Sequence, residues 1–478
     1  MQQIWEIAGN VFETTVFTYG MVLLVSYALL AICSLVAVRR WVMTDKYQNG
    51  EVLLTSPLAP GISVIAPAYN EGLTIIYNIR SLLTLKYARY EIIVVNDGST
   101  DDSMEQLIKE FSLVAVDFAY NAKIQTRPVK KIYKSTDPAY AKLMIIDKVN
   151  GKSKADAVNA GINAAAYDYF VCTDVDCILH ENTIIELVKP VMKEKNKRVI
   201  ATGATLRAAN SNTFDQGVMV NVKAPRQVLP RFQEVEYIRA FVLGKMGWTL
   251  LNCVPNVSGG LGLFDKEIAI RCGGYDHSSF GEDMELMTRM CRYAIDNKID
   301  YAIRYIPKTL CWTEVPSTLR IFGRQRTRWA RGLAQLMYAH IGMFMRPRYG
   351  RFGLVVFPYN FFFELLAPII EGGGILFFVV MGILGFINWP TAIVLLVFVY
   401  TYAIMITTLA ILYDQITFRY YNSWKDILLL CMMPFFEFFI YHPLIVFFSL
   451  RGYYFFLTGK KSGWGVMQRR GFQTASKI

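Results

Sequence analysis

An uncharged run of 23 residues, from Val16 to Val38, constrains this chain more than any other feature of its sequence. About 20 apolar residues are enough for a helix to cross a bilayer, so the run predicts a transmembrane helix. Arg39 and Arg40 follow it directly, whereas no Lys or Arg precedes it. Because basic residues concentrate on the cytoplasmic side of membranes, the region after this helix is predicted to be cytoplasmic.

The C-terminal part of the chain is apolar again, from about Phe352 to Leu450. Its apolar segments are interrupted by Glu371–Gly374, by Pro390 and by the polar stretch Asp414–Asp426. These interruptions predict three or four C-terminal spans. We therefore expect a multi-pass protein of the cell (inner or plasma) membrane, in contact with membrane lipids, whose polar middle part is cytoplasmic.

The same pattern divides the chain into five parts. They are residues 1–45 with a transmembrane helix at about 16–38, a cytoplasmic domain at 46–316, a juxtamembrane interface region at 317–351, the C-terminal transmembrane segments at 352–450 and a basic cytoplasmic tail at 451–478. The tail carries six Lys and Arg, residues 318–351 carry eight Arg, and neither stretch has an acid. Basic clusters beside a membrane are typical of lipid contacts, so no nucleic-acid partner is expected.

The polar part alternates short β-branched runs with helical stretches. Strands are predicted at Ile62–Ala66, Glu91–Asn96 and Tyr167–Thr173, and helices at Glu71–Leu85 and Ser153–Ala166. Such alternation indicates βαβ units, and therefore an α/β domain with a mostly parallel sheet. In sheets of this kind the ligand binds beyond the carboxyl ends of the strands. Eight cysteines without a CxxC pair exclude a disulfide scaffold and a structural zinc site of ordinary spacing.

Acidic residues follow the predicted strands. Asp97 comes after one strand, and Asp174 and Asp176 come after another. Paired carboxylates at a strand end suit a hard divalent cation such as Mg²⁺, which in proteins binds carboxylates together with substrate phosphates. Asp is also common in the turns that follow strands, so a simple turn stays open as the alternative.

Two further motifs have two interpretations each. Asp283, in Gly281-Glu282-Asp283 before a predicted helix, could be a general base or only a cap for that helix. Gln325, Arg328 and Trp329 share one face of a helix at spacings of three and four residues. That face could anchor the helix at lipid headgroups, or it could offer an Arg fork for a diphosphate beside an indole for a sugar ring.

Taken together and in this order, the motifs resemble those of the processive, membrane-integrated family-2 glycosyltransferases. This family includes the bacterial cellulose, hyaluronan, chitin and poly-N-acetylglucosamine synthases, and the pattern looks closest to the last of these. The resemblance covers about residues 62–331. Its motifs are PAYNE at 67–71, VVNDGSTDD at 94–102, GKSKADAVNAG at 151–161, DVD at 174–176, GED at 281–283 and QRTRW at 325–329.

The resemblance implies a cytoplasmic GT-A glycosyltransferase domain. Its reaction would be inverting transfer from a UDP-sugar, with UDP-N-acetylglucosamine favoured, to a growing β-linked polysaccharide that the membrane bundle exports. The implied partners are the UDP-sugar, a polysaccharide or lipid-linked acceptor and accessory secretion subunits, and the implied cofactor is Mg²⁺ or Mn²⁺. The resemblance also implies a role for each motif residue. Pro67, Tyr69, Glu71 and Asp97 would bind the uridine, Lys154 would contact the diphosphate or the uracil, and Asp174 would belong to the substrate pocket. Asp176 would bind the cation, Asp283 would be the general base, and Gln325, Arg328 and Trp329 would close the site.

The chain departs from the family pattern at two places. Gly281 stands where a Ser or Thr is usual, and the polar segment Arg207–Arg231 has no counterpart; we interpret it as a loop over the donor site. Two other functions remain open. One is a single-addition enzyme with a lipid acceptor, although such enzymes often lack the Gln-x-x-Arg-Trp motif. The other is a non-catalytic membrane protein that binds a nucleotide sugar, although binding alone would not need Asp283.

Overall fold

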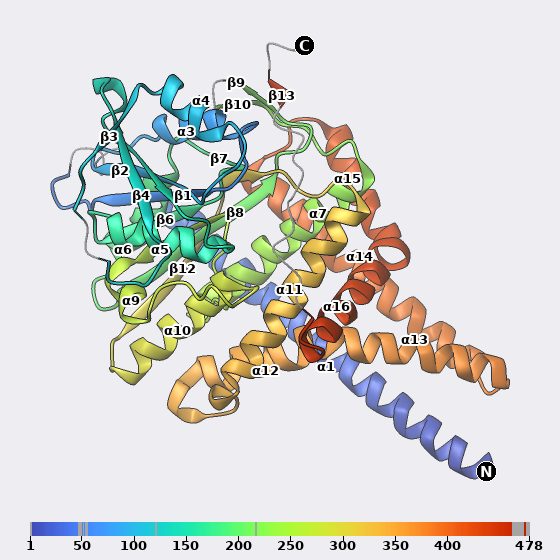
Figure 1. The fold of residues 1–478 in the computed structure, drawn as a ribbon. Coiled ribbons are helices and arrows are strands. Elements are labelled where there is room, and N and C mark those ends of the chain that lie inside the picture. Colours follow the sequence, from blue (N-terminus) through green and yellow to red (C-terminus); the bar gives the residue numbers. More distant parts are fainter. Residues whose placement is uncertain are drawn as a thin grey trace.

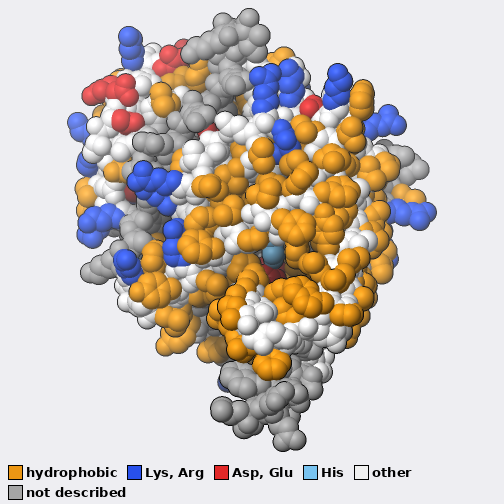
Figure 2. All heavy atoms as spheres, turned by 90° about the vertical axis from the view of Figure 1, so that its right-hand side faces the viewer, with side chains coloured by type: hydrophobic (Ala, Val, Ile, Leu, Met, Phe, Trp, Pro, Cys, Tyr) orange, Lys and Arg blue, Asp and Glu red, His pale blue; other side chains and the backbone are white. Residues whose placement is uncertain are grey.

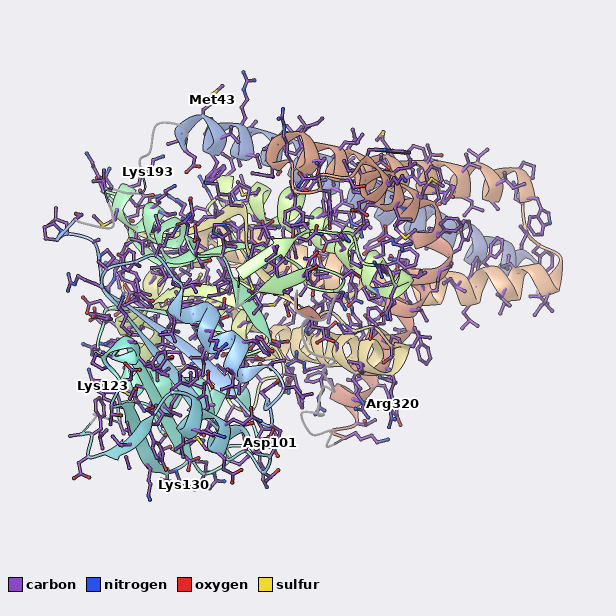
Figure 3. The ribbon with its side chains drawn as sticks, turned by 90° about the horizontal axis from the view of Figure 1, so that it is seen from above. Met43, Asp101, Lys123, Lys130, Lys193 and Arg320 are labelled. Atoms are coloured by element: carbon purple, nitrogen blue, oxygen red, sulfur yellow. The ribbon has the colours of Figure 1, made fainter. Side chains whose placement is uncertain are left out.

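The computed structural model describes residues 2–45, 50, 52, 56–119, 122–215, 218–460 and 473–474, with side chains described from residue 14 onward. An α/β domain occupies one side of the molecule, and long helices project from the other side (Figure 1). The projecting helices are α1 (Gln2–Asp45), α13 (Ala367–Leu384) and α14 (Trp389–Phe418). Figure 3 shows Lys123, Lys130 and Lys193 at the end of the domain that faces away from these helices.

A ten-stranded sheet forms the centre of the α/β domain, in the order β3-β4-β5-β2-β1-β6-β11-β8-β12-β7. The run β5-β2-β1-β6 is parallel, as is the pair β8–β12, whereas β11 is antiparallel to both of its neighbours. This arrangement confirms the predicted α/β class with a parallel centre. The strands are β1 (Ile62–Ala68), β2 (Tyr90–Asn96), β3 (Leu113–Val116), β4 (Val129–Ser135), β5 (Leu143–Lys148), β6 (Tyr169–Thr173), β7 (Cys177–Leu179), β8 (Arg198–Ala208), β11 (Leu261–Asp265) and β12 (Tyr301–Thr313).

Helices cover the sheet because its central strands are apolar along their whole length. Val64, Ile93 and Val171 are fully buried, as parallel strands with helices on both faces require. Helix α5 packs against β1 and β2, and α6 against β8 and β12. The helices of the domain are α3 (Ile75–Leu83), α4 (Ser103–Glu110), η1 (Pro138–Tyr140), α5 (Lys154–Ala164), α6 (Thr183–Lys193), α9 (Lys266–Arg271) and α10 (Glu282–Asp296).

The segment Arg207–Arg231 is not one loop, contrary to our interpretation. Arg207 belongs to β8, which runs to Ala208 and is buried at its end. A small sheet follows, in which β9 (Thr213–Asp215) pairs with β10 (Val218–Asn221) and with β13 (Gln473–Thr474). Helix α7 then begins at Val228. The polar character of the segment reflects a hairpin and a buried arginine, not a lid.

Helix α7 (Val228–Ile238) continues through the wider turn η2 (Arg239–Lys245) into α8 (Met246–Leu250). The chain is therefore helical from Val228 to Leu250, with a π-helical turn in the middle. Such turns often occur at functional sites. The long helix α11 (Leu319–Ala339) carries the QRTRW motif. The remaining helical segments are η3 (Ile341–Met343), η4 (Pro347–Tyr349), η5 (Phe352–Val356), α12 (Phe357–Tyr359), η6 (Asn360–Leu365), α15 (Trp424–Phe436), η7 (Glu437–Tyr441) and α16 (His442–Leu457).

Within the described residues, four helical segments are long and apolar enough to cross a membrane: Thr14–Asp45, Phe352–Leu384, Ala392–Phe418 and Trp424–Leu457. On the face that they build, apolar side chains form a broad field with Lys and Arg around its margins (Figure 2). Such a face indicates that the protein associates with a membrane.

The expected interruption at Glu371–Gly374 does not occur, because α13 runs through it without a break. A helix bonds all of its backbone groups internally, which apolar surroundings demand even where three glycines follow one another. The acidic residue of this stretch is also accommodated, since Glu371 pairs with His442 of α16 at 2.8 Å. Three long apolar segments therefore follow the domain.

Helix α7 joins the α/β domain to the membrane-side helices through ion pairs. The three charged residues involved lie along this helix and its continuation η2, and each pairs with a different partner. We call these contacts the α7 ion pairs. The three pairs are Glu234 with Arg207 of β8, Glu236 with Arg326 of α11, and Arg239 with Glu437 of η7. Arg207 also contacts Asp414 of α14.

Candidate active site

The carboxyl ends of β2, β1 and β6 lie side by side, because these strands are parallel neighbours. Ala68 at the end of β1 is in register with Asn96 at the end of β2, and Ile65 is in register with Cys172 of β6. The residues that follow these strands therefore meet at one edge of the sheet. They include Asp97 and Asp174, as the sequence predicts.

Asp97 is held at this edge by two donors. Its Oδ1 accepts hydrogen bonds from the Lys148 Nζ at 2.7 Å and from the Gly151 amide at 2.9 Å. Lys148 is fully buried and also contacts Asp156, so two carboxylates share one ammonium. The cluster keeps an excess negative charge beside the strand end. A ligand that donates an N–H group would complement it.

The segment that follows β1 is locked onto the loop that follows β2. Asn70 has a φ of 54°, and its amide donates to the Ser99 Oγ at 2.9 Å. Its side-chain oxygen in turn accepts from the Thr100 amide at 2.8 Å. Glu71 accepts from the Thr74 Oγ1 at 3.0 Å, whereas Tyr69 is 43% exposed. Pro67, the first residue of the motif, is still part of β1.

Lys154 and Asp174 form a close ion pair next to Gly259. The Lys154 Nζ lies 2.5 Å from the Asp174 Oδ1 and donates to the Gly259 carbonyl at 2.9 Å. Burial alone would lower the pKa of Lys154, but the Asp174 carboxylate holds it above its ordinary value. Lys154 is therefore a permanent cation at the strand edge, where a diphosphate would need one.

A group of side chains that could hold a cation lies at the end of β6. One ligand atom each of Asp174, Asp176 and Cys177 lies within 4.8 Å of the others. A hydrogen bond with Cys311 and burial together raise the pKa of the Cys177 thiol well above its ordinary value, so the sulfur stays protonated. The two carboxylates are then the effective ligands. This donor set fits Mg²⁺ or Mn²⁺.

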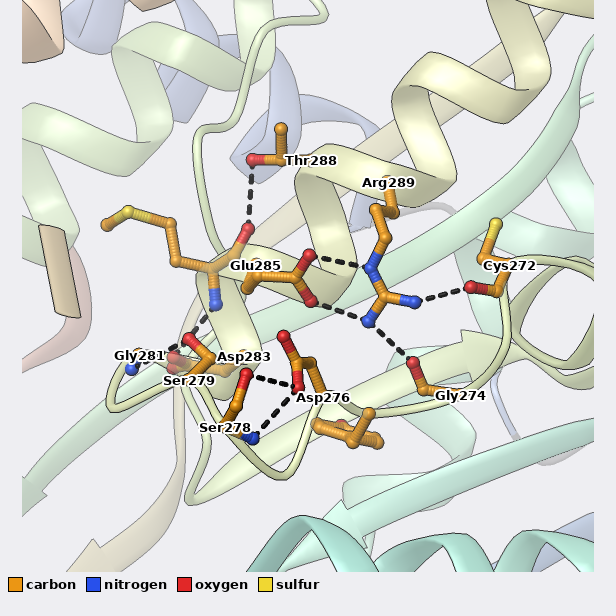
Figure 4. A network of polar contacts seen from close by, with 12 residues as sticks. Cys272, Gly274, Asp276, Ser278, Ser279, Gly281, Asp283, Glu285, Thr288 and Arg289 are labelled. Carbon is orange, nitrogen blue, oxygen red and sulfur yellow. Dashed lines mark hydrogen bonds and ion pairs between the residues drawn. The ribbon is translucent and has the colours of Figure 1, made fainter. Parts of the chain in front are cut away.

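Asp283 lies in the first turn of α10 and faces the same backbone segment as Lys154. Its Oδ2 accepts a hydrogen bond from the Gly259 amide at 2.9 Å. Gly259 thus contacts both side chains: its N–H donates to Asp283 and its C=O accepts from Lys154. Figure 4 shows the surrounding loop tied to α10 by Arg289, which donates to Glu285 and to the Gly274 carbonyl. This network fixes the start of α10, and with it Asp283.

Glu282 is a buried carboxyl that sequence reasoning missed. Burial raises its pKa above the ordinary value; the Asp283 carboxylate adds to this rise, and the Arg328 guanidinium and the Lys154 ammonium oppose it. The interaction of the Arg328 guanidinium with the Glu282 carboxyl shows that Arg328 of α11 lies near the start of α10. Asp174, Lys154, Asp283 and Arg328 are therefore brought into one site, whereas Asp97 and Glu71 lie in its strand-edge part.

The start of α10 and helix α11 touch backbone to backbone at Gly281 and Gly332, and this contact requires a glycine at 332. A Cβ added to Gly332 would lie 2.6 Å from the Gly281 nitrogen, far inside van der Waals contact. One added to Gly281 would lie 3.4 Å from the Gly332 Cα. The departure from the usual Ser or Thr thus accompanies an unusually close approach of the two helices that carry Asp283 and Trp329.

We expect Gly332→Ala to reduce turnover by at least about tenfold, because the added methyl group must push α11 away from Asp283, and displacements of about 1 Å can cost 10²-fold. The measurement is the steady-state rate of glycosyl transfer by the full chain. Gly342→Ala is the matched control, since its Cβ would meet open space. Equal activity of the two variants would contradict the importance of this contact.

The QRTRW motif lies on α11, and one of its predicted site residues, Arg328, interacts with Glu282 of α10. The Gln325 Oε1 is buried and, in the part of the chain described, has no hydrogen-bond partner. Such an orphaned acceptor points to a missing donor, as a bound sugar hydroxyl would supply. Trp329 is 39% exposed, and the Arg326 guanidinium lies 4.6 Å from its ring centroid.

Lys245 of η2 is another group that the sequence did not reveal. Its Nζ lies 5.0 Å from the ring centroid of Phe241 and 5.4 Å from that of Tyr305. Burial lowers the pKa of Lys245 to about 8, although the Asp283 carboxylate acts in the opposite direction. No motif marks this lysine, and only the folded chain places it near Asp283.

The fold and the site together define a glycosyltransferase, and comparison with protein families agrees. Residues 63–219 match the family model of glycosyl transferase family 2, and residues 170–412 match that of glycosyl transferase family group 2. Because the second match covers half of the chain, the chain belongs to this family of glycosyltransferases. The resemblance stated from the motifs is confirmed at this level.

Among curated proteins, the chain is similar to poly-β-1,6-N-acetyl-D-glucosamine synthases. It is 27% identical to that of Staphylococcus epidermidis over 272 residues, which are 57% of this chain and 54% of the relative. It is 26% identical to that of Staphylococcus aureus over 306 residues, which are 64% of this chain and 62% of the relative. The matches thus span only about half to three fifths of these relatives.

Among solved structures, the chain resembles a mannosyltransferase from Pyrobaculum calidifontis, determined in complex with GDP-Man and Mn²⁺. The TM-score is 0.51 at 16% sequence identity, and the match covers 92% of this chain and 100% of that one. The likeness shows that the two proteins share the GT-A fold.

Proposed function

We propose that the chain is an inverting glycosyltransferase that transfers N-acetylglucosamine from UDP-N-acetylglucosamine to a growing β-linked polysaccharide. The observation that supports this most is the position of Gly259, whose amide contacts Asp283 at 2.9 Å while its carbonyl contacts Lys154 at 2.9 Å. A base and a diphosphate-binding cation held by the backbone of one residue suit a displacement at an anomeric carbon. The similarity to poly-β-1,6-N-acetyl-D-glucosamine synthases favours this donor.

The donor binds along the strand edge in this proposal. Asp97, with its excess of negative charge, accepts the N–H of the uracil ring, and the locked segment Pro67–Glu71 packs against the nucleoside. Lys154 and Arg328 face the diphosphate, which needs cations in a partly buried site. Asp176 and Asp174 would hold Mg²⁺ or Mn²⁺, which neutralises charge on the leaving diphosphate.

Transfer is a single displacement. The oxygen of the acceptor hydroxyl forms a bond to the anomeric carbon of the donor, while the bond from that carbon to the diphosphate oxygen breaks and its electron pair stays with UDP. The hydroxyl proton passes to the Asp283 carboxylate. Since attack and departure take place on opposite faces, an α-linked donor yields a β-linked product.

The acceptor and membrane parts complete the proposal. Gln325 and Trp329 bind the terminal sugar of the acceptor, and the domain belongs to the cytoplasmic part of a multi-pass membrane protein in this proposal. Helix α16 lies along α11, where its Arg451 donates to the Gly323 carbonyl at 2.9 Å. In this proposal α1 and the three apolar segments that follow the domain, Phe352–Leu384, Ala392–Phe418 and Trp424–Leu457, cross the bilayer and line the export path.

The test is UDP release by the full chain in nanodiscs with Mg²⁺ or Mn²⁺, measured against UDP-N-acetylglucosamine, UDP-glucose and UDP-glucuronic acid. We expect turnover of the first donor at least about tenfold above the others, loss of turnover on chelation of the cation, and a product of mixed lengths. A product carrying a single sugar on lipid would favour the single-addition alternative. Tight UDP binding without turnover of any donor would favour a binding protein.

A further inference from the structure

Trp329 is supported on one face by a guanidinium. The Arg326 Cζ lies 4.6 Å from the centroid of the indole ring, within the range of a cation–π contact. The indole is nevertheless 39% exposed, so a substantial part of it stays open. A half-exposed Trp side chain without support would sample several orientations, which a sugar-binding platform must avoid.

Arg326 is itself fixed by hydrogen bonds to a carboxylate and a hydroxyl. Its Nη1 and Nη2 donate to the two carboxylate oxygens of Glu236, each at 2.6 Å. The Nη2 also donates to the Tyr441 hydroxyl at 2.9 Å. Arg326 is only 6% exposed, and its guanidinium also lies 4.9 Å from the Phe322 ring centroid. A guanidinium whose two terminal nitrogens are both hydrogen-bonded to a buried carboxylate has little remaining rotational freedom.

The pair stays charged at neutral pH. Burial raises the pKa of Glu236, but the Arg326 guanidinium outweighs burial and holds that pKa below its ordinary value. The fork is therefore permanently occupied by a carboxylate. Arg326 is not available to bind a diphosphate, which distinguishes it from Arg328 two residues later on the same helix.

We propose that Arg326 is a positioning residue for acceptor binding: held by Glu236 of α7 and Tyr441 of η7, it fixes the plane of the Trp329 indole on which the terminal sugar of the acceptor stacks. The inference rests on the proposed function, because it takes Trp329 as the acceptor platform. It adds that the acceptor site depends on η7, a segment of the membrane-side region. Donor binding, by contrast, does not depend on Arg326.

The experiment compares Arg326→Met with the unaltered chain and with Arg324→Met, an exposed arginine on the same helix that serves as the matched control. The acceptors are short β-linked N-acetylglucosamine oligosaccharides. We expect Arg326→Met to raise the acceptor KM by about tenfold, which corresponds to about 1.4 kcal/mol, and to leave the donor KM and the UDP Kd within about twofold. Arg326→Lys should resemble Arg326→Met, since it keeps the charge but lacks the fork.

Equal changes in the donor and acceptor constants, or no change in either, would overturn the inference. Because Arg326→Met could fail to fold, Tyr441→Phe provides a second test: it removes one hydroxyl, and we expect a smaller rise of the acceptor KM in the same direction. UDP binding and the melting temperature report folding of each variant. A Tyr441→Phe protein with unchanged constants, alongside an unfolded Arg326→Met protein, would also overturn the proposal.

Direct binding separates this inference from the proposed function. Calorimetric titration of the oligosaccharide in the presence of UDP requires no turnover. Weaker oligosaccharide binding by Arg326→Met, with UDP binding intact, supports the inference even if the unaltered chain transfers no sugar, an outcome that would contradict the proposed function alone. An unaltered chain that binds UDP but no oligosaccharide would overturn both.

Discussion

Asp283→Asn should abolish glycosyl transfer while UDP binding persists. The amide has the size of the carboxylate and can still accept the Gly259 N–H through its oxygen, so the start of α10 keeps its place. It cannot take the proton of the acceptor hydroxyl, and loss of a general base typically lowers a rate by 10²–10⁴-fold. UDP release by the full chain measures the rate, and titration with UDP measures binding.

Asp276→Asn is the matched control for this substitution. Asp276 lies in the loop before α10 and accepts hydrogen bonds from the Ser278 amide and hydroxyl, each at 2.8 Å (Figure 4). Its replacement should change the rate by no more than a few fold. If Asp283→Asn kept more than about a tenth of the activity, the base would have to be sought elsewhere, first at Glu282 through Glu282→Gln.

Arg207→Met should cause the largest loss of stability in this chain. The Arg207 guanidinium is 1% exposed and lies between Glu234, at 2.9 Å, and Asp414. Its removal leaves two carboxylates buried without their cation, and breaking a buried pair in this way costs about 3–5 kcal/mol. We expect the melting temperature of the full chain in detergent to fall on the order of 10 °C.

An exposed ion pair provides the comparison. Arg80 pairs with Glu110 in a position where their side chains are 43% and 35% exposed. Arg80→Met should therefore change stability by no more than about 1 kcal/mol. Similar melting temperatures for Arg207→Met and Arg80→Met would show that the buried pair contributes no more than the exposed one.

The position of the acidic residues at the strand edge could be predicted from sequence because its signals are local. A β-branched run that ends in Asp97 or in Asp174 predicts both the strand and the edge at which the acid lies, since parallel neighbours share that edge. The same logic applies to Lys154, which opens the helix after a glycine-containing turn. These residues lie within a few positions of the element that places them.

The contacts between elements distant in the chain could not be predicted. Lys148 and Glu282 occupy positions that look ordinary in sequence, and only the packing of β5 and α10 makes them buried charges. Arg207 suggested a polar loop because its partners Glu234 and Asp414 stand 27 and 207 residues away. Buried charges resemble surface charges until their partners are known.

The α7 ion pairs bear on how a product could leave the protein. If α14 slid against the sheet by one helical turn, about 5.4 Å, Arg207 and Asp414 would part in a place that water does not reach. Movement of η7 would part Arg239 and Glu437, whose side chains are 33% and 12% exposed. In the proposed function, the helices along the exit path are thus bonded to the domain that binds the sugars. The product would then leave by movement of the newly added sugar, while α7 and its ion-pair partners keep their positions.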